Sequence, residues 1–150
     1  MGLVSEAGMP AVADPGSSVV RAAHALGARV VPLVGPVSLL LTLAASGLNG
    51  QNFAFVGYLP QDASERAQRV RALEALALKN RQTQLFIETP YRNAALWQAL
   101  LQTLQPSTQL TCAAGLTLAQ ASIHTRSASQ WRGHAIPVDN RTPAVFAIGG

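Results

Sequence analysis

Apolar and polar residues alternate along the first quarter of the chain in blocks that predict a strand, a helix and a second strand. The run GLVSEAG (2–8) ends in a loop of glycine and proline, which is typical of a buried strand entering a turn. Asp14 is expected to cap a helix that stops near Gly27, and an apolar strand follows over 29–34. A strand this apolar is typical of a parallel sheet that is covered on both faces.

The rest of the chain alternates between helix and strand and then ends on strands alone. After a Gly-Pro turn, the pattern predicts a helix over 37–46, a strand over 53–59, a helix over about 63–78, a strand over 83–88 and a helix from Pro90. From Thr108 onward three strand-like runs follow with no long helix between them, which indicates antiparallel pairing. We therefore expect an α/β fold with a partial parallel β-α-β unit over 1–35, followed over 36–150 by an α/β domain with a mixed sheet.

The helix predicted over 63–78 has two distinct sides. Asp62 and Glu65 have capping-box spacing at its start. Its expected buried stripe consists of Val70, Leu73, Leu76 and Ala77. The opposite side carries Arg66, Arg69 and Arg71.

The charge balance is basic, with 11 Lys and Arg against 7 Asp and Glu and a formal charge of +4. This balance suits a polyanion such as RNA, although many proteins of similar charge bind no nucleic acid. Cys112 is the single cysteine, so the chain forms no internal disulfide and no multi-thiolate metal site, and a reducing, cytoplasmic location is expected. The three histidines share no metal-ligand spacing, and we expect no metal site.

The most apolar stretch, residues 30–48, is interrupted by Pro32, Gly35, Pro36, Ser38, Thr42 and Ser46. This composition favours a strand, a turn and a helix over a membrane span, and no membrane partner is expected.

Three loops follow predicted strand ends: SEAGMPAVADPG, GPVS and ETPYR. Ligands of open α/β sheets bind at the carboxyl ends of the strands, although each loop is also explained as an ordinary glycine-proline turn. In ETPYR, Arg92 lies near a helix N-terminus, where the helix dipole disfavours a cation. Its anionic partner is therefore either Glu88 or a ligand phosphate, and the sequence leaves both open.

Five segments in order, VSEAGMPAVADPG, VVPLVGPVSLLLTLAASGL, FVGYLP, FIETPYR and PAVF, resemble motifs of the tetrapyrrole methylase superfamily. The resemblance is strongest to its 16S rRNA ribose 2′-O-methyltransferase branch, and it extends over nearly the whole chain. It implies two α/β domains with S-adenosylmethionine folded between them. It also implies that strands of the first domain precede this sequence in the family, so that 1–35 is the last β-α-β of that domain and 36–150 is the second domain.

The resemblance also implies a set of site residues. The residues expected to contact the cofactor are Gly8, Met9, Val12, Val37, Ser38, Glu88, Leu116, Pro143 and Ala144. Glu88 is also the candidate base for the ribose hydroxyl. The residues expected to face the RNA are Tyr91, Arg92, Arg66 and Arg69.

The chain departs from the rRNA branch at some positions. Glu6 and Met9 replace an aspartate and a threonine, and AAGLTLAQASI lacks the charges typical of that branch. Two alternatives therefore stay open: a non-catalytic binding or dimerisation module of the same fold, and a methyltransferase that acts on a porphyrinoid. A homodimer is expected in each case.

Overall fold

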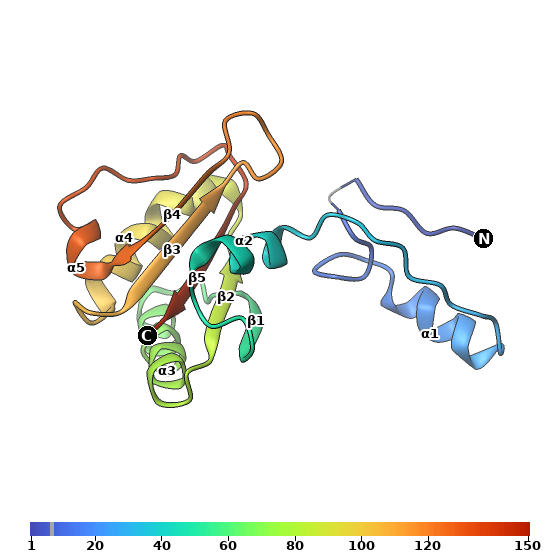
Figure 1. Cartoon of the computed structure of the whole chain (residues 1–150). Helices are drawn as coiled ribbons and strands as arrows, with labels where there is room; N and C mark the ends of the chain where they lie inside the picture. Colours follow the sequence, from blue (N-terminus) through green and yellow to red (C-terminus); the bar gives the residue numbers. More distant parts are fainter. Residues whose placement is uncertain (7) are drawn as a thin grey trace. The chain divides into compact units, whose positions relative to one another are not determined.

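The computed structural model describes residues 1–6 and 8–150, and the chain divides into two compact units, Met1–Ser38 and Leu39–Gly150 (Figure 1). In the first unit the helix α1 (Ser17–Ala25) confirms the predicted helix. The helix begins after Gly16, and no side chain caps it. The expected cap at Asp14 is therefore wrong, because that residue lies too far before the first helical turn.

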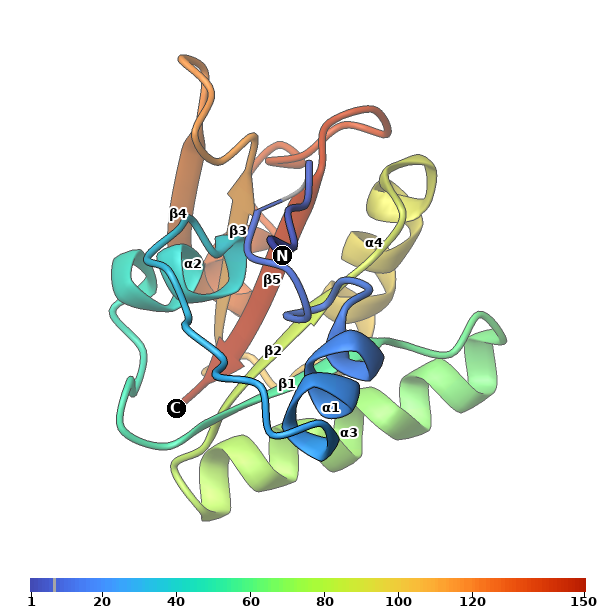
Figure 2. The same cartoon turned by 90° about the vertical axis from the view of Figure 1, so that its right-hand side faces the viewer.

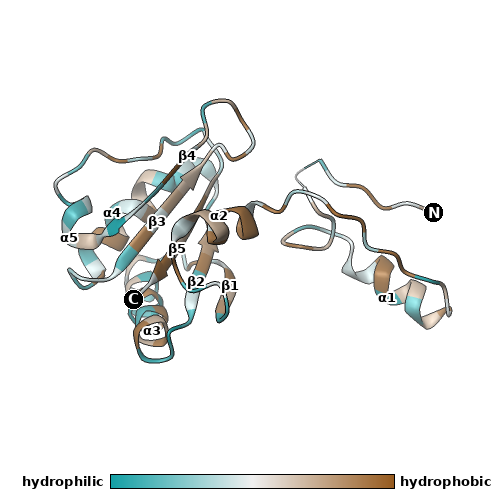
Figure 3. Cartoon of the chain, in the orientation of Figure 1, coloured by the Kyte–Doolittle hydropathy of each residue, from teal (hydrophilic) through white to brown (hydrophobic). Residues whose placement is uncertain are grey.

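The two strands predicted in the first unit are absent from its described residues. Residues 29–34 are extended but belong to no sheet, and Leu33 is 79% exposed. This apolar run, which is brown in Figure 3, leads from α1 to α2. A strand needs a neighbouring backbone to pair with, and the described part of this unit supplies none. One residue of the strand predicted over 2–8 lies outside the described residues, and the others form no strand either.

The second unit contains one mixed sheet and its helices. Its elements are α2 (Ser38–Ser46), β1 (Phe53–Tyr58), α3 (Ala63–Lys79), β2 (Thr83–Ile87), η1 (Pro90–Arg92), α4 (Asn93–Thr103), β3 (Gln109–Ala114), β4 (Ser122–Ser127), α5 (Ala128–Trp131) and β5 (Ala144–Gly149). The strand order is β1-β2-β5-β3-β4, with β1 and β2 parallel and the other pairs antiparallel. The predicted mixed sheet and the antiparallel end of the chain are confirmed, and α5 was not predicted.

Helices α3, α4 and α5 cover one face of this sheet and enclose the core. Phe86 and Phe146 stack on neighbouring strands with ring centroids 6.1 Å apart, and Trp97 of α4 lies against Phe146. Trp97 also meets Trp131 of α5 edge to face at 5.0 Å. All four rings are buried, so this aromatic cluster is the centre of the apolar core.

Helix α2 packs on the opposite face of the sheet (Figure 2). Leu39 and Leu43 are buried there, and the Thr125 hydroxyl of β4 donates to the carbonyl of Ser46 at 2.7 Å. Thr125 in turn shares a 2.7 Å hydroxyl contact with Thr111 of β3. Both faces of the centre of the sheet are thus covered within the second unit.

Helix α3 begins as predicted, but one position of its buried stripe is wrong. The Asp62 carboxylate accepts from the amides of Ser64 and Glu65, both at 2.9 Å. Leu76 is 40% exposed, and Glu74 is buried in its place. A carboxylate is tolerated there because it accepts from the Gln105 amide at 2.8 Å and from the Thr108 hydroxyl.

In the described part of the chain, no helix is both long enough and apolar enough to cross a membrane.

Candidate functional site

Three segments that carry expected cofactor residues meet at one edge of the sheet in the second unit. The end of β2, the end of β3 and the start of β5 lie there, because Ile87 pairs with Val145 and Ala114 pairs with Ala144. The backbone amide of Gly115 donates to the carbonyl of Pro143 at 3.0 Å. Four of the residues expected to contact the cofactor therefore belong to this edge: Glu88, Leu116, Pro143 and Ala144. We call it the carboxyl edge, after the end of β2 that it contains.

Glu88 and Arg92 form an ion pair at the carboxyl edge. Oε1 of Glu88 lies 2.8 Å from Nη2 and 3.1 Å from Nε of Arg92, and it also accepts from the Thr89 amide at 2.7 Å. The side chain of Glu88 is 1% exposed and that of Arg92 is 24% exposed. The sequence left two anionic partners possible for Arg92, and in the structure Arg92 is paired with Glu88.

The environment of Glu88 keeps it ionised. Burial acts to raise the pKa of its carboxyl, but the hydrogen bond from Arg92, those from Thr89 and the positive charge of Arg92 together lower it below its ordinary value. The same pairing raises the pKa of Arg92. A carboxylate held in this way is a weak acceptor for a further proton, so the geometry favours Glu88 as an anchor for Arg92 over Glu88 as a base.

Tyrosine side chains are exposed at the same end of the sheet. Tyr91 is 66% exposed, its hydroxyl accepts from Nη1 of Arg92 at 3.0 Å, and the guanidinium lies 5.0 Å from its ring centroid. Tyr58 ends β1 opposite Ile87 and is 59% exposed. An exposed aromatic ring beside a fixed cation is suited to stacking on a base or contacting a phosphate.

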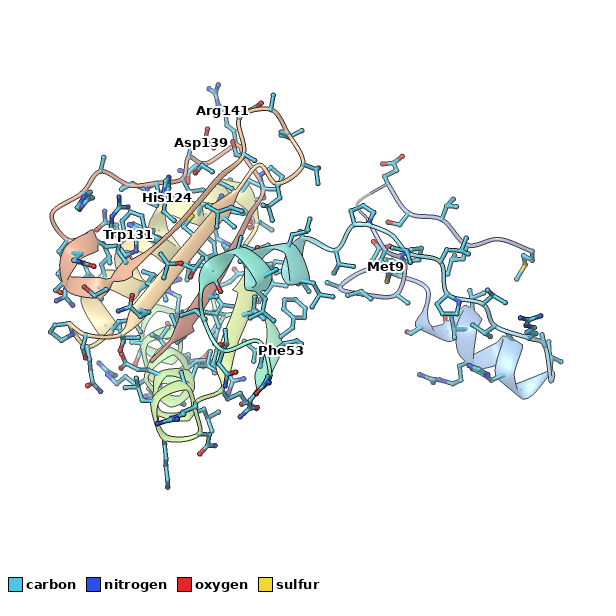
Figure 4. The ribbon with its side chains drawn as sticks, viewed as in Figure 1. Met9, Phe53, His124, Trp131, Asp139 and Arg141 are labelled. Carbon is cyan, nitrogen blue, oxygen red and sulfur yellow. The ribbon has the colours of Figure 1, made fainter. Side chains whose placement is uncertain are left out.

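A tight turn over 139–142 leads into Pro143 (Figure 4). Oδ1 of Asp139 accepts from the amides of Arg141 and Thr142, at 2.9 and 2.7 Å, and these bonds lower the pKa of its carboxyl. Asn93 of α4 donates from its side-chain amide to carbonyls of the same turn. Sequence reasoning missed both residues, although Asp and Asn, which follow each other at 139 and 140, are typical of turns.

The expected cofactor residues of the first unit lie on two adjoining segments. The amide of Met9 donates to the carbonyl of Pro36 at 3.1 Å. At Gly8, φ is 132°, and an added Cβ would lie 2.8 Å from the same carbonyl oxygen. A glycine is therefore required where this loop approaches the turn that leads to Val37 and Ser38.

The same loop carries two strained residues on either side of Val12. Ala11 and Ala13 have φ of 65° and 55°. Such positions are uncommon for residues other than glycine and concentrate at ligand-binding loops. Val12 itself is 41% exposed.

Two of the arginines expected to face RNA, Arg66 and Arg69, lie on the first two turns of α3. Arg66 is half-buried, and its Nη1 donates to the carbonyl of Gln61 at 3.2 Å. Its buried Nε has no hydrogen-bond partner among the described residues. Arg69 is exposed. The structure therefore gives Arg66 a local anchor and leaves Arg69 open to a partner.

Three other kinds of site were considered: a metal site, a reactive thiol and a pocket away from the carboxyl edge. Among residues 1–6 and 8–150, no group of three or more His, Cys, Asp or Glu side chains is placed to hold a metal ion. Burial raises the pKa of Cys112 to about 12, so its thiol is protonated and is no nucleophile. Pockets of about 610 and 410 Å³ lie beside Arg81 and beside Trp131, and none of the expected cofactor residues lines either of them.

Proteins named ribosomal RNA small subunit methyltransferase I are among the sequence relatives of this chain. The chain is 42% identical over 90 residues to ribosomal RNA small subunit methyltransferase I of Pseudomonas aeruginosa. These residues are 60% of this chain and 30% of that protein. It is 34% identical over 122 residues to the protein of the same name from Escherichia coli O157:H7, and these residues are 81% of this chain and 41% of that protein. The chain thus spans about a third of the length of these curated relatives. No protein-family model matches it.

Methyltransferases are among the solved structures that this chain resembles. The methyltransferase CobJ matches 95% of this chain and 61% of its own, with a TM-score of 0.57 and 19% identity. Uroporphyrin-III C-methyltransferase from Thermus thermophilus, solved with S-adenosylhomocysteine, matches 94% of this chain and 62% of its own, with a TM-score of 0.54 and 17% identity. At this level of identity the likeness concerns the fold. The chain is therefore similar in sequence to part of ribosomal RNA small subunit methyltransferase I, and its fold is that of the tetrapyrrole methylases.

Proposed function

We propose that the chain is part of a methyltransferase that uses S-adenosylmethionine to methylate a ribose 2′-hydroxyl of ribosomal RNA. The observation that carries this proposal is the identity of 34–44% to proteins named ribosomal RNA small subunit methyltransferase I. The meeting of Glu88, Leu116, Pro143 and Ala144 at the carboxyl edge supports it.

Identity and charge favour RNA over a porphyrinoid as the substrate. Uroporphyrin-III C-methyltransferase from Thermus thermophilus is only 17% identical to this chain. The second unit contains nine Lys and Arg against five Asp and Glu and thus carries the whole formal charge of +4. Four of its acids are engaged within the fold: Asp62, Glu74 and Asp139 accept from backbone amides, and Glu88 is paired with Arg92. The net charge of this unit is positive, which suits a phosphate backbone.

Small buried residues lie beside less buried apolar ones at the carboxyl edge, which suits a nucleoside such as the adenosine of the cofactor. Ala114, Gly115 and Ala144 are buried and carry no side chain larger than a methyl group. Leu116 and Pro143 flank these positions and supply apolar contact. From the first unit, Gly8, Met9, Val12, Val37 and Ser38 are the residues proposed to hold the same cofactor.

The cofactor, when bound, supplies the methyl group, and the chain's own residues orient the acceptor. Glu88 holds Arg92 in place, and Arg92 with Tyr91 binds a phosphate or base of the RNA. Arg66 and Arg69 extend this positive surface along α3. Arg92 and Thr89 lower the pKa of the Glu88 carboxyl, and this opposes its taking the proton of the ribose hydroxyl.

The proposed substrate implies a cytoplasmic protein, and we propose that it acts as a homodimer. A non-catalytic module of the same fold is the competing function. Calorimetric titration of the folded chain with S-adenosylmethionine separates the two. The proposal predicts saturable heat and a rise in melting temperature with cofactor concentration. A folded chain that gives neither at millimolar cofactor would support the non-catalytic module.

RNA binding needs its own measurement. Filter binding to ribosomal RNA over a salt series is expected to give a steep negative slope, and Arg69→Ala is expected to reduce that slope by about 1 if the side chain meets a phosphate. The matched control is Arg21→Ala, on α1 of the first unit, which is expected to leave the slope unchanged. An Arg69→Ala slope equal to that of the unmodified chain would remove α3 from the proposed RNA surface.

A further inference from the structure

We propose that Asn93 is a positioning residue that fixes the turn over 139–142 and thereby sets the backbone of Pro143 and Ala144 at the carboxyl edge. The inference rests on the proposed function only in taking S-adenosylmethionine, or its product S-adenosylhomocysteine, as the ligand of this edge. Its structural part concerns the turn alone and can be tested without a ligand.

The side-chain amide of Asn93 bridges the turn. Asn93 is the first residue of α4 and is fully buried, with 0% of its surface exposed. Its Nδ2 donates to the carbonyl of Asp139 at 3.1 Å and to the carbonyl of Thr142 at 2.9 Å. Both amide hydrogens are thus used on two carbonyls at the two ends of one turn, which fixes the distance between those ends.

The turn is fixed from two further directions. Asp139 accepts from the amides of Arg141 and Thr142 within the turn, at 2.9 and 2.7 Å. Oδ1 of Asn140 accepts from the amide of Ala94 at 3.0 Å, which satisfies a donor in the first turn of α4. The start of α4 and the turn therefore hold each other reciprocally, with Asn93 at the buried centre.

The hydrogen bonds between Asn93 and the turn over 139–142, which we call the clamp, connect to the candidate site on both sides. The residue after the turn, Pro143, accepts from the amide of Gly115, so a shift of the turn also shifts the end of β3. The residue before Asn93 is Arg92, which is paired with Glu88. One helix start thus connects the ion pair with both backbone segments of the carboxyl edge.

Simple packing does not explain an asparagine at this position. Oδ1 of Asn93 is buried and has no hydrogen-bond partner among the described residues. A buried acceptor without a partner is unfavourable, and an apolar side chain of similar shape would avoid that cost. What an apolar side chain lacks is the pair of N–H donors that holds the two carbonyls.

Two substitutions test the clamp against a matched control. Asn93→Asp keeps the shape but replaces both donors by a carboxylate facing two carbonyl oxygens, and Asn93→Leu removes all polarity. The control is Asn49→Asp: the Asn49 amide also donates to a backbone carbonyl, that of Arg81 at 2.7 Å, but at the opposite end of β2. The readouts on the full chain are backbone hydrogen exchange without ligand and calorimetric titration with S-adenosylhomocysteine.

The clamp predicts a local effect on exchange. Both substitutions at Asn93 are expected to accelerate exchange about tenfold at the amides of Gly115, Arg141 and Thr142, with no change at Phe86 in the middle of β2. The affinity for S-adenosylhomocysteine is expected to fall about tenfold for both variants at neutral pH. For Asn93→Asp that loss shrinks at lower pH, where the new carboxyl is protonated and regains an O–H donor, whereas for Asn93→Leu it does not change with pH. Asn49→Asp leaves the affinity unchanged.

Two results would overturn the inference. Unchanged exchange at the three amides in both variants would mean that Asn93 does not hold the turn. Equal acceleration across every strand would mean that Asn93 only contributes to global stability. If exchange responds as expected but neither the unmodified chain nor any variant binds S-adenosylhomocysteine, the role of Asn93 in the turn stands and the proposed function fails.

Discussion

Residues 30–34 and strand β5 are similarly apolar, yet the first run is exposed coil and the second is the buried centre of a sheet. Strand β5 lies between β2 and β3, and each of its six residues is buried. In the run over 30–34, Val31 and Leu33 are exposed, and Pro32 has no N–H to offer a neighbouring strand. Apolar sequence thus becomes a strand only where a partner backbone satisfies its hydrogen bonds. The second unit is therefore stabilised by its own buried sheet, whereas the described part of the first unit has no sheet.

The largest expected effect comes from truncating the core of the second unit. Phe146→Ala is expected to lower the free energy of unfolding by about 3–5 kcal/mol, because Phe146 is fully buried against Phe86 and Trp97. Leu33→Ala, in the exposed run, is expected to change it by less than about 0.5 kcal/mol. Urea unfolding followed by circular dichroism measures both. A comparable loss for Leu33→Ala would mean that the exposed run contributes to folding as the core does.

The ion pair at the carboxyl edge gives an intermediate effect that depends on pH. Glu88→Gln is expected to destabilise the chain by about 1.5–3 kcal/mol at neutral pH, since it removes charged hydrogen bonds to a buried oxygen. The pKa of Glu88 is lowered by folding, so its contribution is complete above the unfolded value and is lost as pH falls through the lowered folded value. Unfolding at pH 7 and in steps below about pH 4.5 should therefore show the gap to Glu88→Gln closing with acid. A gap that is the same at every pH would contradict the pairing.

The smallest effect compares the starts of α3 and α1. Asp62→Ala is expected to cost about 1 kcal/mol, because the carboxylate caps two amides of α3. Asp14→Ala is expected to cost almost nothing, because α1 has no side-chain cap. Thermal unfolding of the two variants side by side gives the difference. A larger loss for Asp14→Ala would reverse the assignment of the helix start in the first unit.

The sequence predicted the elements of the second unit because their signals are local. Asp62 marks the start of α3, and short apolar runs mark the strands of the sheet. Helix α5 was missed because it has four residues, too few for a hydrophobic period, and its capping box at Ser127 follows directly on a strand. Leu76 was misplaced because burial of Glu74 depends on donors at Gln105 and Thr108, about thirty residues away in sequence.

The candidate site was predictable in its segments but not in its contacts. The motifs indicated Glu88, Leu116 and Pro143, and the pairing of β5 with both β2 and β3 explains why they share an edge. Asn93 carries no sequence signal, because its role depends on carbonyls 46 and 49 residues away that only the fold brings near.

Titration of the isotope-labelled chain with S-adenosylhomocysteine, followed through backbone amide NMR shifts, tests the central claim most directly. If the carboxyl edge binds the cofactor, saturable shifts appear at Gly115, Leu116 and Ala144. Saturable shifts confined to the pocket beside Trp131 and His134, or no saturable shift at all, would contradict the assignment of this edge as the cofactor site.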